Sequence, residues 1–121
     1  MRPLLQKDIQ QFLERFDNFK ESEIRSLDVI SPTTLTLTLT AQDAARGFDW
    51  ISVEFEFNGV EDAKIVQESQ LDFLDMSEGI SLLFEENLFA FGVGECYNIA
   101  AVKNSACYIV SKGLKYQEGA F

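Results

Sequence analysis

The sequence predicts an α+β fold in which an N-terminal amphipathic helix packs on a mainly antiparallel sheet of about seven strands. Near the N-terminus the apolar residues recur with the period of a helix, and from about residue 23 they alternate with polar residues, as in a half-buried strand. One helix followed by a run of strands is the order typical of α+β proteins. The chain has 121 residues, of which 46% are hydrophobic, so we expect a single domain over 1–121 with its own core.

The first element is a predicted helix over residues 4–19. Its apolar residues follow the i, i+4, i+7, i+8, i+11 spacing and form one stripe, namely Leu5, Ile9, Phe12, Leu13 and Phe16. The opposite side of the stripe is polar. We therefore expect Phe12 and Phe16 to anchor this helix on the sheet.

Three strands are predicted next. The first begins at about residue 23 and stops at the turn signal Ser31-Pro32, and the second, over 34–40, alternates threonine with leucine without error. These two strands are expected to form an antiparallel hairpin. After a polar loop or helical turn, residues 50–57 alternate again, with Glu54 and Glu56 on the outward side.

Asn58-Gly59 follows this third strand directly and predicts a hairpin turn, because both central residues of a type I′ turn need positive φ. A return strand over about 60–66 is then expected. Direct pairing through such a turn would place Glu56 opposite Glu61, and like charges repel there, so a bulge or an early departure is the alternative.

A loop with a helical turn is expected over 67–77. A further hairpin follows, with strands over 79–85 and 88–93 joined at Glu86-Asn87. Residues 96–104 read as an irregular connection or short helix, and the last strand is expected over 106–116.

The composition argues against an enzyme. The chain contains no histidine, which removes the commonest general base and the commonest metal ligand. The segment 72–79 has carboxylates at its first, fourth and seventh positions, which does not fit a calcium loop, so no metal and no cofactor are expected. Cys96 and Cys107 are expected to be reduced thiols, because no apolar signal region precedes them and we expect a cytoplasmic protein.

The charge is strongly negative and uneven. The chain has 20 Asp and Glu against 10 Lys and Arg, a net charge of -10, and between residues 47 and 102 there is only one base, Lys64. Nucleic acid is disfavoured as a partner because phosphate contacts need Lys and Arg, and no apolar run is long enough for a membrane. A basic protein partner would be attracted, although an acidic surface also serves solubility alone. The candidate partner-binding residues are Glu54, Glu56, Glu61, Asp62, Asp72, Asp75, Glu85 and Glu86.

Three segments carry a resemblance to a known class of proteins. They are ISVEFEFNGVEDAKIV (51–66), LDMSEGISLLFEENLFAFGVGECYNI (74–99) and SACYIVSKGLKYQEG (105–119). In size, acidity and strand pattern they resemble small acidic bacterial immunity proteins of polymorphic toxin and contact-dependent inhibition systems. The resemblance implies a cytoplasmic protein that binds and blocks a toxin domain, often a nuclease. It assigns no individual binding residue.

Two other functions are compatible with the sequence. A small-ligand-binding module would enclose an apolar pocket between the phenylalanine-rich sheet and the helix. An assembly subunit would use an exposed edge strand. The sequence leaves open whether the protein is a monomer or a homodimer.

Overall fold

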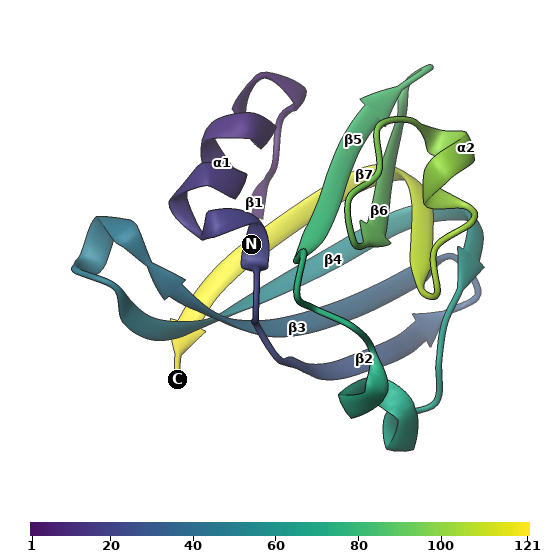
Figure 1. The fold of residues 1–121 in the computed structure, drawn as a ribbon. Coiled ribbons are helices and arrows are strands. Elements are labelled where there is room, and N and C mark those ends of the chain that lie inside the picture. Colours follow the sequence, from purple (N-terminus) through teal and green to yellow (C-terminus); the bar gives the residue numbers. More distant parts are fainter.

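A seven-stranded antiparallel sheet organises the chain in a computed structural model, which describes residues 1–121 (Figure 1). The strand order is β2-β3-β4-β7-β6-β5, and β1 pairs with β7 beyond the end of β6. The protein is thus α+β, as expected. The strands are β1 Arg2–Pro3, β2 Ile24–Ser31, β3 Thr34–Asp43, β4 Asp49–Lys64, β5 Ile80–Glu85, β6 Leu88–Val93 and β7 Tyr108–Ala120.

The helical elements are short. The helix expected over 4–19 is wrong in extent, because its regular part, α1, is only Ile9–Arg15. It lies between the 3₁₀ turns η1 (Gln6–Asp8) and η2 (Asp17–Phe19). Three consecutive residues with φ of 52°, 56° and 58°, Asp17 to Phe19, end the right-handed helix. The other elements are η3 Ala44–Arg46, η4 Glu68–Phe73 and α2 Ile99–Val102.

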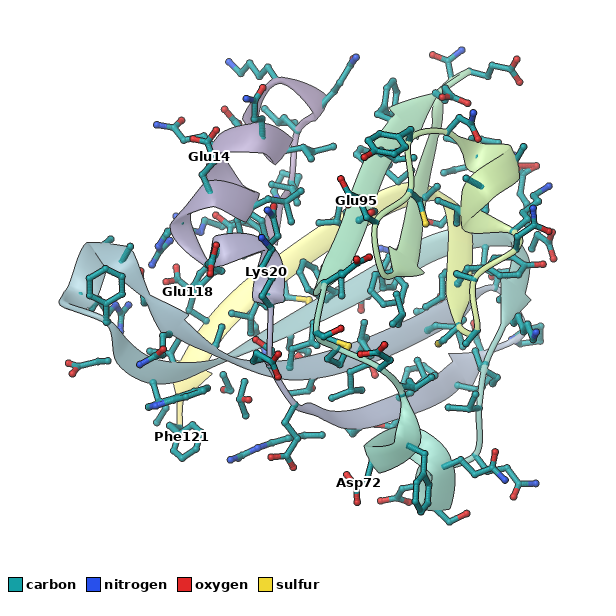
Figure 2. The ribbon with its side chains drawn as sticks, viewed as in Figure 1. Glu14, Lys20, Asp72, Glu95, Glu118 and Phe121 are labelled. Atoms are coloured by element: carbon teal, nitrogen blue, oxygen red, sulfur yellow. The ribbon has the colours of Figure 1, made fainter.

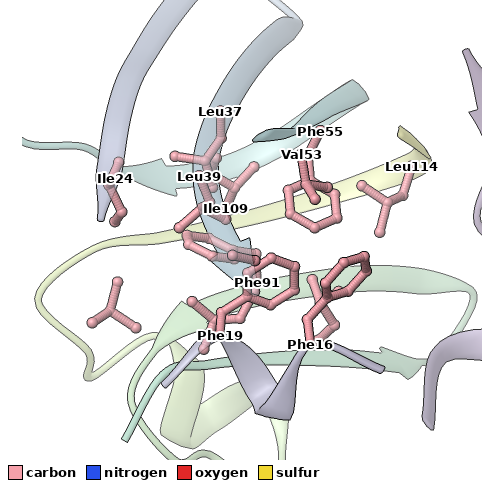
Figure 3. Close-up of a cluster of buried hydrophobic side chains, with 14 of the residues drawn as sticks. Phe16, Phe19, Ile24, Leu37, Leu39, Val53, Phe55, Phe91, Ile109 and Leu114 are labelled. Atoms are coloured by element: carbon pink, nitrogen blue, oxygen red, sulfur yellow. The ribbon is translucent and has the colours of Figure 1, made fainter. Parts of the chain in front are cut away.

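The apolar residues of this helical segment pack on the sheet as expected, except Leu5, which lies before α1 and is 47% exposed. Figure 3 shows Phe16 and Phe19 among the buried side chains. The Phe12 ring lies 4.8 Å from that of Tyr116 and 5.8 Å from that of Phe55, between ring centroids. Phe16 and Phe19 are buried in the same cluster. Edge-to-face contacts of this kind add to the free energy gained by burial, so the aromatic side chains connect the helix to the strands.

The predicted hairpin at Asn58-Gly59 is wrong. Strand β4 continues through both residues and pairs with β3 on one side and β7 on the other. Gly59 has a φ of 63°, and the register with β7 shifts between Val60 and Asp62, so the glycine serves a bulge and not a turn. A long central strand pairs its backbone groups on both sides, and it keeps Glu56 opposite Thr36 and Lys115 instead of Glu61.

The structure confirms β3 and the β5–β6 hairpin and extends the last strand, β7. Leu35, Leu37 and Leu39 on β3 are buried, with the threonines on the other face. The turn between β5 and β6 holds Glu86 at φ 53° and Asn87 at φ 63°, the positive values that a type I′ turn requires. Strand β7 is longer than expected at its C-terminal end, because it pairs with β4 as far as Ala120 and Ile51.

The two faces of the sheet differ. α1 and η2 pack on the face that carries the main core, and α2 packs on the opposite face through a small cluster of Ala90, Val102 and Val110. α2 covers only the β6 end. Towards the β2 end the same face carries unburied side chains, and we call this region the open face. Its two central rows are Asp28, Thr36, Glu56, Lys115 and Ser26, Thr38, Glu54, Gln117.

Candidate protein-binding surface

The eight candidate carboxylates occupy four separate places. Glu54 and Glu56 lie on the open face, Glu61 and Asp62 at the β4 bulge, Asp72 and Asp75 in and after η4, and Glu85 and Glu86 at the β5–β6 turn. Asp72 lies at the bottom of Figure 2, whereas the β5–β6 turn is at the top of Figure 1, which has the same view. The eight residues therefore lie on different sides of the molecule and do not form one patch.

Glu54 and Glu56 are half-buried and oriented by neutral side-chain amides. Gln117 Nε2 donates to Glu54 Oε1 at 2.8 Å, and Asn58 Nδ2 donates to Glu56 Oε2 at 3.1 Å. Neither carboxylate lies within 4.0 Å of a Lys or Arg nitrogen. Their negative charge is therefore fixed in direction and uncompensated within the chain.

Asp62 is the only one of the eight in an ion pair. Its Oδ2 lies 3.5 Å from Lys103 Nζ, and both carboxylate oxygens accept from the Tyr108 hydroxyl at 3.2 Å. Burial and the charge of Asp62 raise the pKa of Tyr108. These contacts connect β4, β7 and the residue after α2, so Asp62 has a structural role in addition to its charge.

Two other candidate carboxylates accept hydrogen bonds from backbone amides. Asp75 Oδ1 accepts from the Ser77 amide at 3.0 Å, and hydrogen bonds from the Ser77 hydroxyl and amide lower the pKa of Asp75. Glu85 Oε1 accepts from the Ile99 amide at 3.3 Å, at the start of α2. Asp72 and Glu86 make no such contact and are exposed.

An arginine network that the sequence did not reveal joins α1, the β3–β4 connection and β7. Arg15 binds the fully buried Asp43 with two hydrogen bonds, Nε to Oδ1 at 2.8 Å and Nη2 to Oδ2 at 2.6 Å, and also contacts Glu118. Arg46 lies 3.3 Å from Asp43, and Arg2 lies 2.9 Å from Glu118. The Arg15 guanidinium holds the pKa of Asp43 below its usual range, and its own pKa is raised. The carboxylates are 28 and 103 positions from Arg15, so no sequence spacing announces them.

An exposed aromatic pair was also missed. Trp50 and Phe121 are 46% and 61% exposed, and their ring centroids are 5.8 Å apart. The Arg25 guanidinium lies 4.5 Å from the centre of the Phe121 ring. The alternation Trp50, Ser52, Glu54, Glu56 already placed Trp50 on the outward side of its strand, which is the signal that identifies it.

The remaining features to consider are an apolar ligand pocket, a metal site and the two cysteines. The phenylalanines that an apolar ligand pocket would need pack against one another in the core. A groove of about 630 Å³ lies beside α1 and is lined by Leu4, Gln11, Arg15 and Tyr116 among others. No three Cys, Asp or Glu side chains gather as metal ligands. Both cysteines are free, and burial raises the pKa of Cys107 to about 11.

The geometry thus defines an α+β protein with carboxylates around its surface and one polar, uncovered sheet face. None of its helices combines the length and the apolar character that crossing a bilayer demands. Comparison with protein-family models, with curated proteins and with solved structures finds no match.

Proposed function

We propose that this protein is a non-enzymatic cytoplasmic binding module, an immunity protein that neutralises a cognate bacterial toxin domain by stoichiometric binding. The observation that carries the proposal is uncompensated charge. The net charge is -10, and of the eight candidate carboxylates only Asp62 is paired with a base. The other seven leave their charge available to a partner.

A surface of this kind favours a basic protein. Uncompensated carboxylates create a negative potential that steers a cationic partner and raises its association rate by roughly tenfold to a thousandfold. The carboxylates lie on different sides of the molecule, so the attraction does not act from one direction alone. The same negative potential repels nucleic acid. For a toxin that is a nuclease, this protein would therefore bind the toxin itself and not the nucleic acid that the toxin cleaves.

Co-expression tests the proposal. The protein is produced together with the C-terminal domain of a toxin encoded beside it, and growth is scored. We expect growth with the wild-type protein and death with an empty vector. Death in both cultures would contradict immunity to that toxin.

An assembly subunit is the second candidate, and one observation favours it. Strand β2 is an edge of the sheet, and its Val29 and Ile30 are 59% and 63% exposed. An uncovered apolar edge strand is a template for pairing with another chain. Sedimentation of the protein alone separates the two functions: an ordered oligomer that Ile30→Lys dissociates would favour assembly, and a monomer would favour the immunity protein.

A further inference from the structure

The open face combines an apolar end with a row of carboxylates on one strand. Trp50, Glu54 and Glu56 point to the same side of β4, and residues two apart on a strand are about 7 Å apart, so the three span about 20 Å. None of the side chains in the two central rows is buried. The face is therefore wide enough for an extended segment or a flat protein surface.

The aromatic pair has the composition of an interface centre. Trp and Arg are the residues most enriched among those that dominate binding energy, and Phe is enriched in interfaces generally. Here Arg25 lies against Phe121, and Phe121 lies against Trp50, so the pair is held in place before any partner arrives. A preorganised aromatic surface loses little conformational entropy on binding.

The charges of the open face select a basic occupant. Glu54, Glu56 and Asp28 make no ion pair, and Lys115, which faces Glu56 across the strands, makes none either. Three carboxylates therefore share this face with two basic side chains, Lys115 and the Arg25 that lies on the Phe121 ring, and the excess charge is negative. Two of the carboxylates are already oriented by Gln117 and Asn58, so a Lys or Arg of the partner meets acceptors with a fixed direction.

A second copy of this chain does not fit the same face. Two copies would each bring a charge of -10, and face-to-face docking would place Glu54 and Glu56 near the carboxylates of the other copy. Like charges across an interface cost binding free energy. The occupant must therefore supply positive charge and an apolar group.

We propose that the open face is the docking site for a basic segment of the protein partner, with Trp50 and Phe121 as its apolar anchor and Glu54 and Glu56 as acceptors for its Lys or Arg. This inference rests on the proposed function and specifies where on the molecule the partner binds. The carboxylates elsewhere on the molecule contribute to steering alone.

The test compares variants with equal charge but different location. The probe is the purified, catalytically inactivated form of the toxin domain that the protein neutralises in the co-expression test, and the measurement is the Kd by calorimetry. Glu54→Lys/Glu56→Lys on the open face is matched with Glu68→Lys/Glu78→Lys, two exposed carboxylates that lie away from it and outside the candidate set. Trp50→Ala is matched with Phe73→Ala, because Phe73 is 85% exposed on η4.

We expect the open-face variants to raise the Kd by about tenfold to a hundredfold and the matched variants to change it by only a few-fold. Thermal unfolding checks that each variant is folded, and Glu54→Gln/Glu56→Gln replaces the lysine pair if that pair unfolds. Equal effects of both sets would overturn the docking site and leave the immunity proposal intact. Failure of the wild-type protein to bind the probe would overturn the proposed function, and the docking site with it.

Discussion

The backbone of Asn18 lies so close to position 79 that only glycine fits there without displacing it. Gly79 has a φ of 72°, and a Cβ atom placed on it would lie 1.9 Å from the Asn18 carbonyl oxygen. Gly47 has a similar φ of 66° but no atom within 4 Å of its Cβ position. The two glycines therefore separate the effect of backbone conformation from that of close packing.

We expect Gly47→Ala to lower the free energy of unfolding by about 1 to 2 kcal/mol, the cost of a left-handed conformation for an L-residue. Gly79→Ala must in addition displace the η2 backbone, which adds roughly 1 to 3 kcal/mol or more. Denaturant unfolding of both variants measures the difference. Equal losses would show that η2 does not lie against Gly79.

Asp43 makes the stability depend on pH. Its pKa is lower in the folded protein than in the unfolded chain, so its ion pair with Arg15 stabilises the fold fully above an unfolded-state pKa of about 3.9. This contribution is lost as the pH falls through the folded pKa. We expect Asp43→Asn to reduce the loss of stability between about pH 5 and pH 2, measured by thermal unfolding. The exposed Asp28→Asn is the control, and an equal effect of both would contradict the account.

The buried Cys107 should react more slowly with iodoacetamide than the partly exposed Cys96. Burial raises the pKa of Cys107 to about 11, so little thiolate forms near neutral pH, and partial burial raises the pKa of Cys96 as well. We expect Cys107 to resist alkylation in the folded protein and both thiols to be modified after denaturation without reductant. Mass spectrometry reads the result. A Cys96–Cys107 disulfide in protein purified without reductant would refute it.

At the scale of elements, α1 depends on aromatic contacts with the sheet. Phe12 is buried and lies against the rings of Phe16, Phe55 and Tyr116. We expect Phe12→Ala to lower the free energy of unfolding by about 3 to 5 kcal/mol. Thr36→Ala on the open face should cost far less. An unchanged melting temperature for Phe12→Ala would mean that α1 is not packed on the sheet.

Elements that local chemistry determines were predictable from the sequence. The alternation over 34–40 predicted β3, and the tolerance of Asn87 for positive φ agrees with the turn between β5 and β6. Asn58-Gly59 has the same local signature as a hairpin, but its structure depends on β7, which pairs with β4 from about fifty positions further along the chain. A local pattern does not contain that information.

In the candidate site too, local sequence predicted some features, and others depend on contacts between distant segments. The outward direction of Glu54 and Glu56 followed from alternation, because a strand places every second side chain on one face. The pairing of Trp50 with Phe121 and of Arg15 with Asp43 and Glu118 depends on which strands and helices become neighbours. Acidity was visible in the composition, but its distribution around the molecule required the fold.

At the scale of the whole molecule, the proposed binding has two separable contributions. The net charge of -10 acts over distance and should govern the association rate, and contacts at the open face act at short range and should govern the dissociation rate. The first contribution is screened by salt and the second much less.

The most direct measurement is the salt dependence of the association rate with the inactivated toxin domain, followed by stopped flow. Between about 0.01 M and 1 M salt the Debye length falls from about 30 Å to about 3 Å, which removes long-range attraction. We expect the association rate to fall by about tenfold or more, while the dissociation rate changes little. An association rate that is independent of salt, or that rises with it, would contradict the claim that the negative charge of this protein recruits a basic partner.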